Sequence, residues 1–120
     1  MHAGDVFSGK NLPLLDANNG GSGVAIPDTL AKAASAIKNV DTIINGHIPT
    51  STFDDLKEYA QFTKEFADFA EKAMKAGKTA QQAADEWKLD PKYKGYVVSV
   101  NPAFGGARSN MEIAYNELKK

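Results

Sequence analysis

Residues 40–47 read Val-Asp-Thr-Ile-Ile-Asn-Gly-His, and this stretch decides the fold. A short run of apolar and β-branched residues closed by Asn-Gly is typical of a buried strand that ends in a turn. We therefore predict a strand over residues 40–45, with His47 just beyond its end. Ligands and metals in α/β sheets bind at the carboxyl ends of strands, and histidine is a frequent metal ligand. His47 is therefore the first candidate for a functional residue.

The amino terminus is the second stretch of this kind, His-Ala-Gly-Asp-Val-Phe over residues 2–7. We predict a strand over residues 2–8, with Val6 and Phe7 buried. Asp5 supplies a carboxylate between a glycine and an apolar pair. If this strand lies beside residues 40–45 in one sheet, Asp5 and His47 can approach each other, and the functional argument depends on that pairing.

The composition is that of one ordinary globular domain over residues 1–120. The chain is 42% hydrophobic and 24% charged, with a net charge of −1 from 14 basic and 15 acidic residues. This balance gives no electrostatic reason to expect nucleic acid or a membrane surface as a partner. The absence of cysteine excludes disulfides and thiolate metal sites. No apolar run approaches the ~20 residues of a membrane helix, and no signal-peptide pattern is present, so we expect a cytoplasmic protein by default.

Helical periodicity accounts for most of the remaining chain. The Tyr96–Val100 segment has strand composition, but its glycine and proline neighbours make it an edge strand at best. We predict an α/β protein in which three or four helices pack a small sheet of two or three strands. The expected helices cover residues 26–38 with a start as early as Ser22, residues 53–76 after a cap at Ser51 or Thr52, residues 80–87 after a Thr-Ala-Gln-Gln capping box, and a final helix capped by Ser109 or Asn110.

A loop over residues 8–23 is unusually long, and such loops tend to be functional. Its Asn-Asn-Gly-Gly run supplies positive φ and free backbone N–H groups. Gly20, Gly21 and Ser22 are therefore candidates for binding an anion at the start of the next helix. A turn followed by a helix cap explains the same residues, and both interpretations stay open. Three leucines would anchor the loop to the core: Leu12, Leu14 and Leu15.

Several segments carry a resemblance by their order and separation. They are His-Ala-Gly-Asp-Val-Phe-Ser-Gly-Lys at 2–10, Asp-Ala-Asn-Asn-Gly-Gly-Ser at 16–22, Thr-Leu-Ala-Lys-Ala at 29–33, the strand and Gly-His at 40–47, and Asn-Met-Glu-Ile-Ala-Tyr-Asn-Glu-Leu at 110–118. Together they resemble the carboxyl-terminal half of the metallo-β-lactamase-fold hydrolases, whose complete fold is an αββα sandwich. The resemblance covers nearly all of the chain.

The resemblance implies a zinc site. In that family the aspartate of the Gly-Asp-hydrophobic-Phe motif bridges two zinc ions, and the histidine of the Gly-His motif ligates one of them. These residues correspond to Asp5 and His47, and His2 is an additional candidate ligand. Carboxylate and imidazole both suit zinc, and a zinc pair generates a hydroxide nucleophile near neutral pH and polarises the scissile bond.

The chain departs from the family in its ligand set. The main motif of the family, His-x-His-x-Asp-His, has no match here, and neither does a further ligand histidine. The sequence contains 2 histidines, whereas a catalytic zinc takes about three protein ligands. The resemblance therefore implies a half-length relative of a zinc-dependent hydrolase, inactive alone, or a half-domain that completes a hydrolase site with a partner chain.

Two alternatives stay open. Half of a two-sheet sandwich leaves one sheet face uncovered, so the chain is also interpreted as a non-catalytic module that buries this face in a homo-oligomer or another partner. The residues that motivate this interpretation are Val6, Phe7, Ile43, Ile44 and the aromatic stripe of the long helix. The other alternative is a small domain that binds an anion at residues 19–22.

Overall fold

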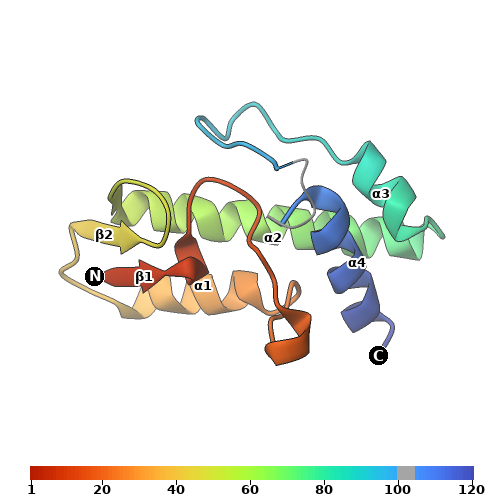
Figure 1. Ribbon diagram of the computed structural model, residues 1–120, viewed down its shortest axis with the longest axis horizontal. Coiled ribbons are helices and arrows are strands. Elements are labelled where there is room, and N and C mark those ends of the chain that lie inside the picture. Colours follow the sequence, from red (N-terminus) through yellow and green to blue (C-terminus); the bar gives the residue numbers. More distant parts are fainter. Residues whose placement is uncertain (100–104) are drawn as a thin grey trace.

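The computed structural model describes residues 1–99 and 105–120. Within them a three-stranded sheet packs with four α-helices (Figure 1). This arrangement confirms the predicted α/β fold of a small sheet and helices. In chain order the elements are β1 (His2–Gly4), the 3-10 turns η1 (Asp5–Phe7) and η2 (Ala17–Asn19), α1 (Ile26–Ala36), β2 (Thr42–Asn45), β3 (Ser51–Thr52), α2 (Phe53–Lys75), α3 (Ala80–Glu86) and α4 (Ala107–Leu118).

The sheet has the strand order β1-β2-β3. β1 and β2 are parallel, with His2 opposite Ile44 and Gly4 opposite Asn45, and β3 is antiparallel to β2. Parallel neighbours need a long crossover connection, which here contains α1. The predicted pairing of the amino-terminal strand with residues 40–45 is therefore confirmed. β3 was not predicted, because a two-residue strand carries no alternation pattern.

The first strand is shorter than predicted. β1 ends at Gly4, whose φ of 55° favours glycine, and the chain then forms the turn η1. As a result Phe7 is fully buried as predicted, whereas Val6 is 52% exposed rather than buried.

The long loop after β1 is anchored to the core by Leu12, which is buried. Leu14 is 65% exposed and does not anchor the loop, contrary to the prediction.

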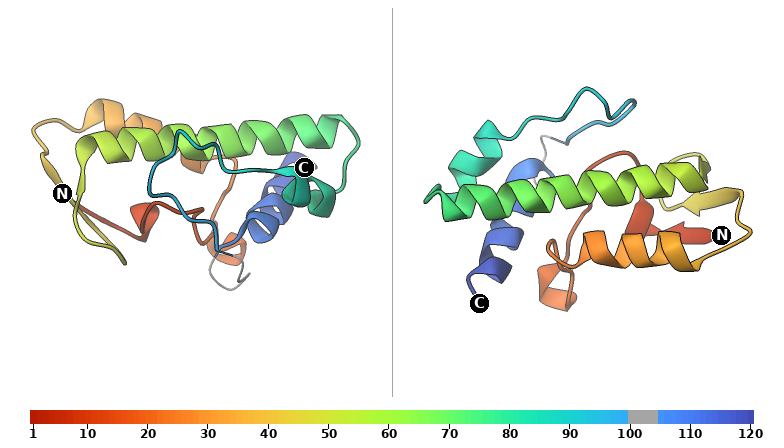
Figure 2. Two further views of the ribbon diagram at one scale, coloured as in Figure 1. Left: turned by 90° about the horizontal axis from the view of Figure 1, so that it is seen from above. Right: turned by 180° about the vertical axis from the view of Figure 1, so that it is seen from behind.

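α2 runs the length of the molecule, with α1 beside it and α3 and α4 near its carboxyl end (Figure 2). Its start confirms the predicted cap at Thr52. The Asp55 backbone N–H donates to Thr52 Oγ1 at 3.1 Å, and the Thr52 backbone N–H donates to Asp55 Oδ2 at 2.8 Å. This reciprocal capping box satisfies N–H groups that the helix itself leaves without partners.

The hydrogen bond from the Thr52 backbone N–H, assisted by the Lys10 ammonium, lowers the pKa of Asp55 below its ordinary value. Because this pKa is lower in the folded than in the unfolded chain, the carboxylate stabilises the fold fully above about pH 4 and loses that effect as the pH falls through the folded-state value. We expect Asp55→Asn to lower the free energy of unfolding by about 1 kcal/mol at neutral pH. The difference from the wild type should shrink in acid.

Urea unfolding followed by circular dichroism at several pH values measures this effect. Asp54→Asn is the matched control, because the Asp54 side chain is 90% exposed and its ion pair is with Lys57 on the same helix. An Asp55→Asn difference that stays the same down to about pH 2.5 would contradict the assignment.

Aromatic rings form the centre of the core. Phe62 of α2 lies inside this group of rings and is only 2% exposed. Its ring centroid lies 5.2 Å from that of Tyr93, 4.6 Å from that of Tyr96 and 6.3 Å from that of Trp87. The segment after α3 folds back over α2 and covers this ring, which helical periodicity alone could not indicate.

The segment after α3 contains no strand over residues 96–99, so the predicted edge strand is wrong there, and Val100 lies outside the described residues.

The last helix, α4, begins earlier than predicted, at Ala107 after Gly106. The predicted cap residue Asn110 instead lies inside the protein, 2% exposed. Its Nδ2 donates to the carbonyl oxygens of Pro13 at 2.9 Å, Gly105 at 3.1 Å and Gly106 at 3.1 Å.

Candidate functional site

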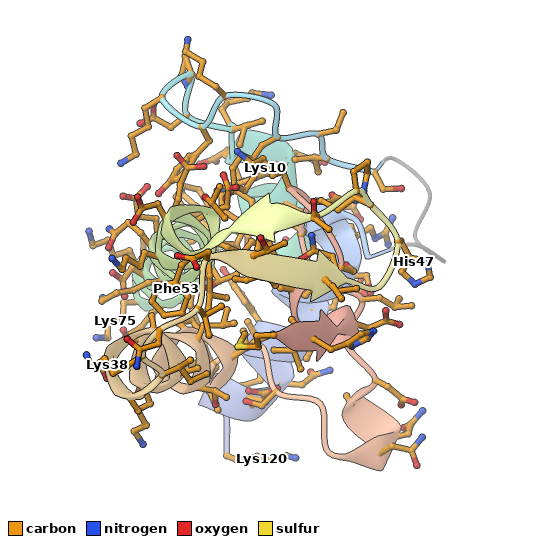
Figure 3. The ribbon with its side chains drawn as sticks, turned by 90° about the vertical axis from the view of Figure 1, so that its left-hand side faces the viewer. Lys10, Lys38, His47, Phe53, Lys75 and Lys120 are labelled. Atoms are coloured by element: carbon orange, nitrogen blue, oxygen red, sulfur yellow. The ribbon has the colours of Figure 1, made fainter. Side chains whose placement is uncertain are left out.

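Asp5 and His47 meet at one edge of the sheet. Because β1 and β2 are parallel, their carboxyl ends lie together; Asp5 directly follows β1, and His47 follows β2 by two residues. The distance from Asp5 Oδ1 to His47 Nε2 is 3.1 Å. Figure 3 shows His47 at this end of the sheet, away from Phe53 at the start of α2. The predicted approach of the two side chains is therefore confirmed.

The two side chains are open to solvent, with 74% of Asp5 and 72% of His47 exposed. An ion pair this exposed contributes little to stability, so a contribution to folding does not account for the contact. Neighbouring ligands of a tetrahedral zinc ion with bonds of ~2.1 Å lie ~3.4 Å apart. The separation of 3.1 Å is close to that value. The pair therefore fits two positions of a zinc site.

Gly46 makes this approach possible. A Cβ atom at position 46 would lie 1.8 Å from Asp5 Oδ1 and 3.3 Å from the carbonyl carbon of Gly4. The Asp5 carboxylate thus occupies the space that any other residue would fill. From the sequence, Gly46 is only a turn residue. The signal for its role at the site is its position directly before the candidate ligand His47.

Asn45 holds the loop that carries His47. Its side chain is buried at the end of β2, and its Nδ2 donates to Ser51 Oγ at 2.7 Å and to the Pro49 carbonyl oxygen at 3.0 Å. These bonds close the loop between β2 and β3. The position of His47 is therefore set by a buried amide as well as by the sheet.

His2 lies on β1 opposite Ile44, and its Nδ1 accepts a hydrogen bond of 3.1 Å from the Gly4 backbone N–H. In residues 1–99 and 105–120 no group of three or more histidine, aspartate or glutamate side chains is arranged to hold a metal ion. A role for His2 as a third ligand stays a prediction. Asp5 and His47 are therefore candidate ligands for only part of a metal site.

The glycine-rich stretch before α1 contacts a carboxylate of the chain itself. Glu117 of α4 accepts hydrogen bonds from Ser22 Oγ at 2.7 Å and from the backbone N–H groups of Gly23 at 3.0 Å and Val24 at 3.1 Å. The Gly21 backbone N–H donates within the loop, to the Asp16 carbonyl oxygen at 2.7 Å. External anion binding at Gly20, Gly21 and Ser22 stays a prediction, and at Ser22 it would require displacement of Glu117.

We expect Glu117→Ala to lower the free energy of unfolding by about 1–2 kcal/mol, because three bonds to a partly buried carboxylate are lost. Glu117→Gln, which keeps one acceptor oxygen, should have a smaller effect. Urea unfolding measures both. The control is Glu112→Ala on the same helix, whose carboxylate is 50% exposed and pairs with Arg108. Equal effects of the two alanine variants would contradict a structural role for Glu117.

No protein-family model matches the chain, and no curated protein matches it significantly. The resemblance to metallo-β-lactamase-fold hydrolases therefore stays a prediction from its motifs. In the described part of the chain, no helix has the length and apolar character needed to cross a membrane.

Proposed function

We propose that the chain is the carboxyl-terminal half of a zinc-dependent hydrolase of the metallo-β-lactamase fold. It supplies Asp5 and His47 to a metal pair whose other ligands come from outside residues 1–120. The observation that supports this proposal most directly is the 3.1 Å approach of Asp5 Oδ1 to His47 Nε2 at neighbouring strand ends. Two exposed, ligand-type side chains at this edge of an α/β sheet are arranged as a binding site requires.

The chemistry follows from the ligand types. Asp5 has two carboxylate oxygens and can contact two cations, while His47 offers Nε2 to one of them. Bound zinc supplies an activated water and polarises the bond to be hydrolysed. Gly46 leaves the space that the Asp5 carboxylate needs, and Asn45 orients the loop that carries His47. With two ligands where about three are needed per zinc, the chain alone is expected to hold metal weakly and to be inactive.

The test is zinc binding by the purified chain, measured as metal content and by NMR of the two histidine rings. We expect well under two tightly held zinc ions per chain. Added zinc should shift the ring signals of His47, and Asp5→Asn should weaken this response. The His2 ring gives an internal comparison, since the sequence contains 2 histidines. Two tightly bound zinc ions per chain would overturn the half-site proposal, and a response confined to His2 would overturn the ligand assignment.

Gly46→Ala is a prediction that isolates geometry from ligand chemistry. The new methyl group displaces Asp5 while both candidate ligands remain in the sequence. We expect the zinc response of His47 to fall about as far as in Asp5→Asn, with a change in the free energy of unfolding below about 1 kcal/mol, because the displaced carboxylate is exposed. For the zinc response, Gly20→Ala controls for glycine replacement away from the site; it is not a control for stability, because the φ of 89° at Gly20 favours glycine. An unchanged zinc response in Gly46→Ala would contradict the role of Gly46.

Complementation tests the missing half. When the chain is mixed with a polypeptide that carries the His-x-His-x-Asp-His half of the fold, we expect two zinc ions per complex and a gain in hydrolysis. The same mixture with Asp5→Asn should show neither. No gain at any mixing ratio would reject completion by a separate chain.

The second candidate is a non-catalytic oligomerising module, and two exposed side chains favour it. Ile44 of β2 is 49% exposed, and Val6 after β1 is 52% exposed. A partner that covered them would remove apolar surface from water. Sedimentation velocity at micromolar concentration measures this, with Ile44→Lys expected to shift an oligomer toward the monomer. A wild-type chain that is folded and monomeric would count against this candidate.

A further inference from the structure

A pocket of about 470 Å3 opens beside His47. Three segments build it: the loop after β1, the loop after β2 and the segment that folds back after α3. The Val97 backbone N–H donates to the Lys10 carbonyl oxygen at 2.9 Å, which ties the first segment to the third. A Cβ atom at Gly9 would lie 3.0 Å from Ile48 Cγ2, so the first segment also packs directly on the second. The pocket is thus formed by the fold itself.

Each of the three segments contributes an aliphatic side chain to the pocket, which is also lined by polar side chains: Ser8, Lys10, Asn11 and His47. Leu14, Ile48 and Val97 come from the three different segments and are 65%, 38% and 69% exposed. Exposed aliphatic side chains that converge on one concavity are typical of a site for an apolar ligand. A cavity of about 150 Å3 is enough for benzene, so this pocket has room for an aromatic ring or a short alkyl chain.

In the metal-free chain, the lysine that lines the pocket is already paired and is not free to hold an anionic ligand. Among the described residues that line the pocket there is one lysine, Lys10, and no arginine. Lys10 Nζ lies 2.9 Å from Asp55 Oδ1 and 3.6 Å from Glu58 Oε1. The hydrogen bond to Asp55 raises the pKa of Lys10 above its ordinary value. The ammonium is therefore committed to two carboxylates, and a negatively charged group would have to compete with both for it.

We propose that this pocket binds an uncharged apolar group of the substrate, a short alkyl chain or a single aromatic ring, next to the Asp5–His47 site. This inference rests on the proposed function, because it takes the occupant to be part of the molecule that is hydrolysed. It adds a substrate class: esters, amides or related compounds whose group on this side of the scissile bond is neutral and apolar.

The test uses the metal-free chain, so that it does not depend on zinc. Two probes with the same chain length, n-hexanol and hexanoate, are titrated at neutral pH while the backbone amide signals are followed by NMR. We expect n-hexanol to shift the signals of Gly9, Gly95 and Val97. We expect hexanoate to bind at least about tenfold more weakly, because its carboxylate loses hydration without gaining a free cation.

Two valine variants separate the pocket from general surface effects. Val97→Asn places an amide in the pocket wall and should weaken n-hexanol binding several-fold. Val6→Asn changes another exposed valine that does not line the pocket and should leave binding unchanged. Hexanoate binding as tight as that of n-hexanol, or n-hexanol binding that ignores Val97→Asn, would overturn the inference. If n-hexanol binds as expected while His47 does not respond to zinc, the hydrolase proposal fails and the apolar pocket stands.

Discussion

Phe62→Ala is expected to lower the free energy of unfolding by about 3–5 kcal/mol. The Phe62 ring is 2% exposed and contacts four other aromatic rings. Its removal leaves a cavity between α2 and the segment that folds back after α3, and neither side can close it without breaking ring contacts. Because domains of this size are stable by about 5–15 kcal/mol, this single change removes a large part of the total.

Urea unfolding followed by circular dichroism measures the effect. Phe69→Ala is the matched control, since Phe69 lies on the same helix but is only partly buried. We expect a clearly smaller loss there. Similar losses for the two variants would show that Phe62 is not the centre of the core.

Asn110→Ala is expected to lower the free energy of unfolding by about 2–4 kcal/mol. The buried Asn110 amide donates to the carbonyl oxygens of Pro13, Gly105 and Gly106. Without it these buried acceptors lose a hydrogen-bond donor, and an unsatisfied buried polar group costs about 1–3 kcal/mol. Gly105 permits this close contact, because its φ of 73° favours glycine and a Cβ atom there would lie 2.5 Å from the Pro13 carbonyl oxygen.

Asn110→Asp sharpens this test. It keeps the shape of the side chain but replaces the donor with a carboxylate that faces carbonyl oxygens, so we expect it to destabilise at least as much as alanine. Asn116→Ala, at an exposed position of the same helix, should stay within about 0.5 kcal/mol of the wild type. An Asn110→Asp variant as stable as the wild type would contradict the hydrogen-bond assignment.

The parts of the fold that were predicted carry their signals locally. The cap of α2, predicted at Ser51 or Thr52 and found at Thr52, lies within four residues, and so does the predicted capping box that opens α3, where the Gln82 N–H donates to Thr79 Oγ1. The strand over residues 40–45 was recognised from its composition and its Asn-Gly ending. The approach of Asp5 to His47 followed once the two strands were taken as neighbours, because strand ends place the residues after them.

The parts that were missed depend on contacts between distant segments. Asparagine is a common helix cap, and this favoured the cap interpretation of Asn110. The hydrogen bond that Asn110 donates to Pro13 joins residues 97 positions apart. Glu117 reaches Ser22 across 95 positions. At the site, the candidate ligands could be recognised from their residue types. The space requirement at Gly46 could not, because it arises only when two strand ends meet. The apolar pocket likewise needs three segments that are separate in the chain.

Trp87 is the one tryptophan of the sequence. Its ring lies 5.0 Å from that of Phe66, at the junction of α3 and α2, while the sheet lies near the other end of α2 (Figure 1). Intrinsic fluorescence therefore reports the docking of α3 and is insensitive to direct occupancy of the sheet edge. An emission change that precedes the loss of helical ellipticity during unfolding would mean that α3 separates from α2 before the rest of the protein melts.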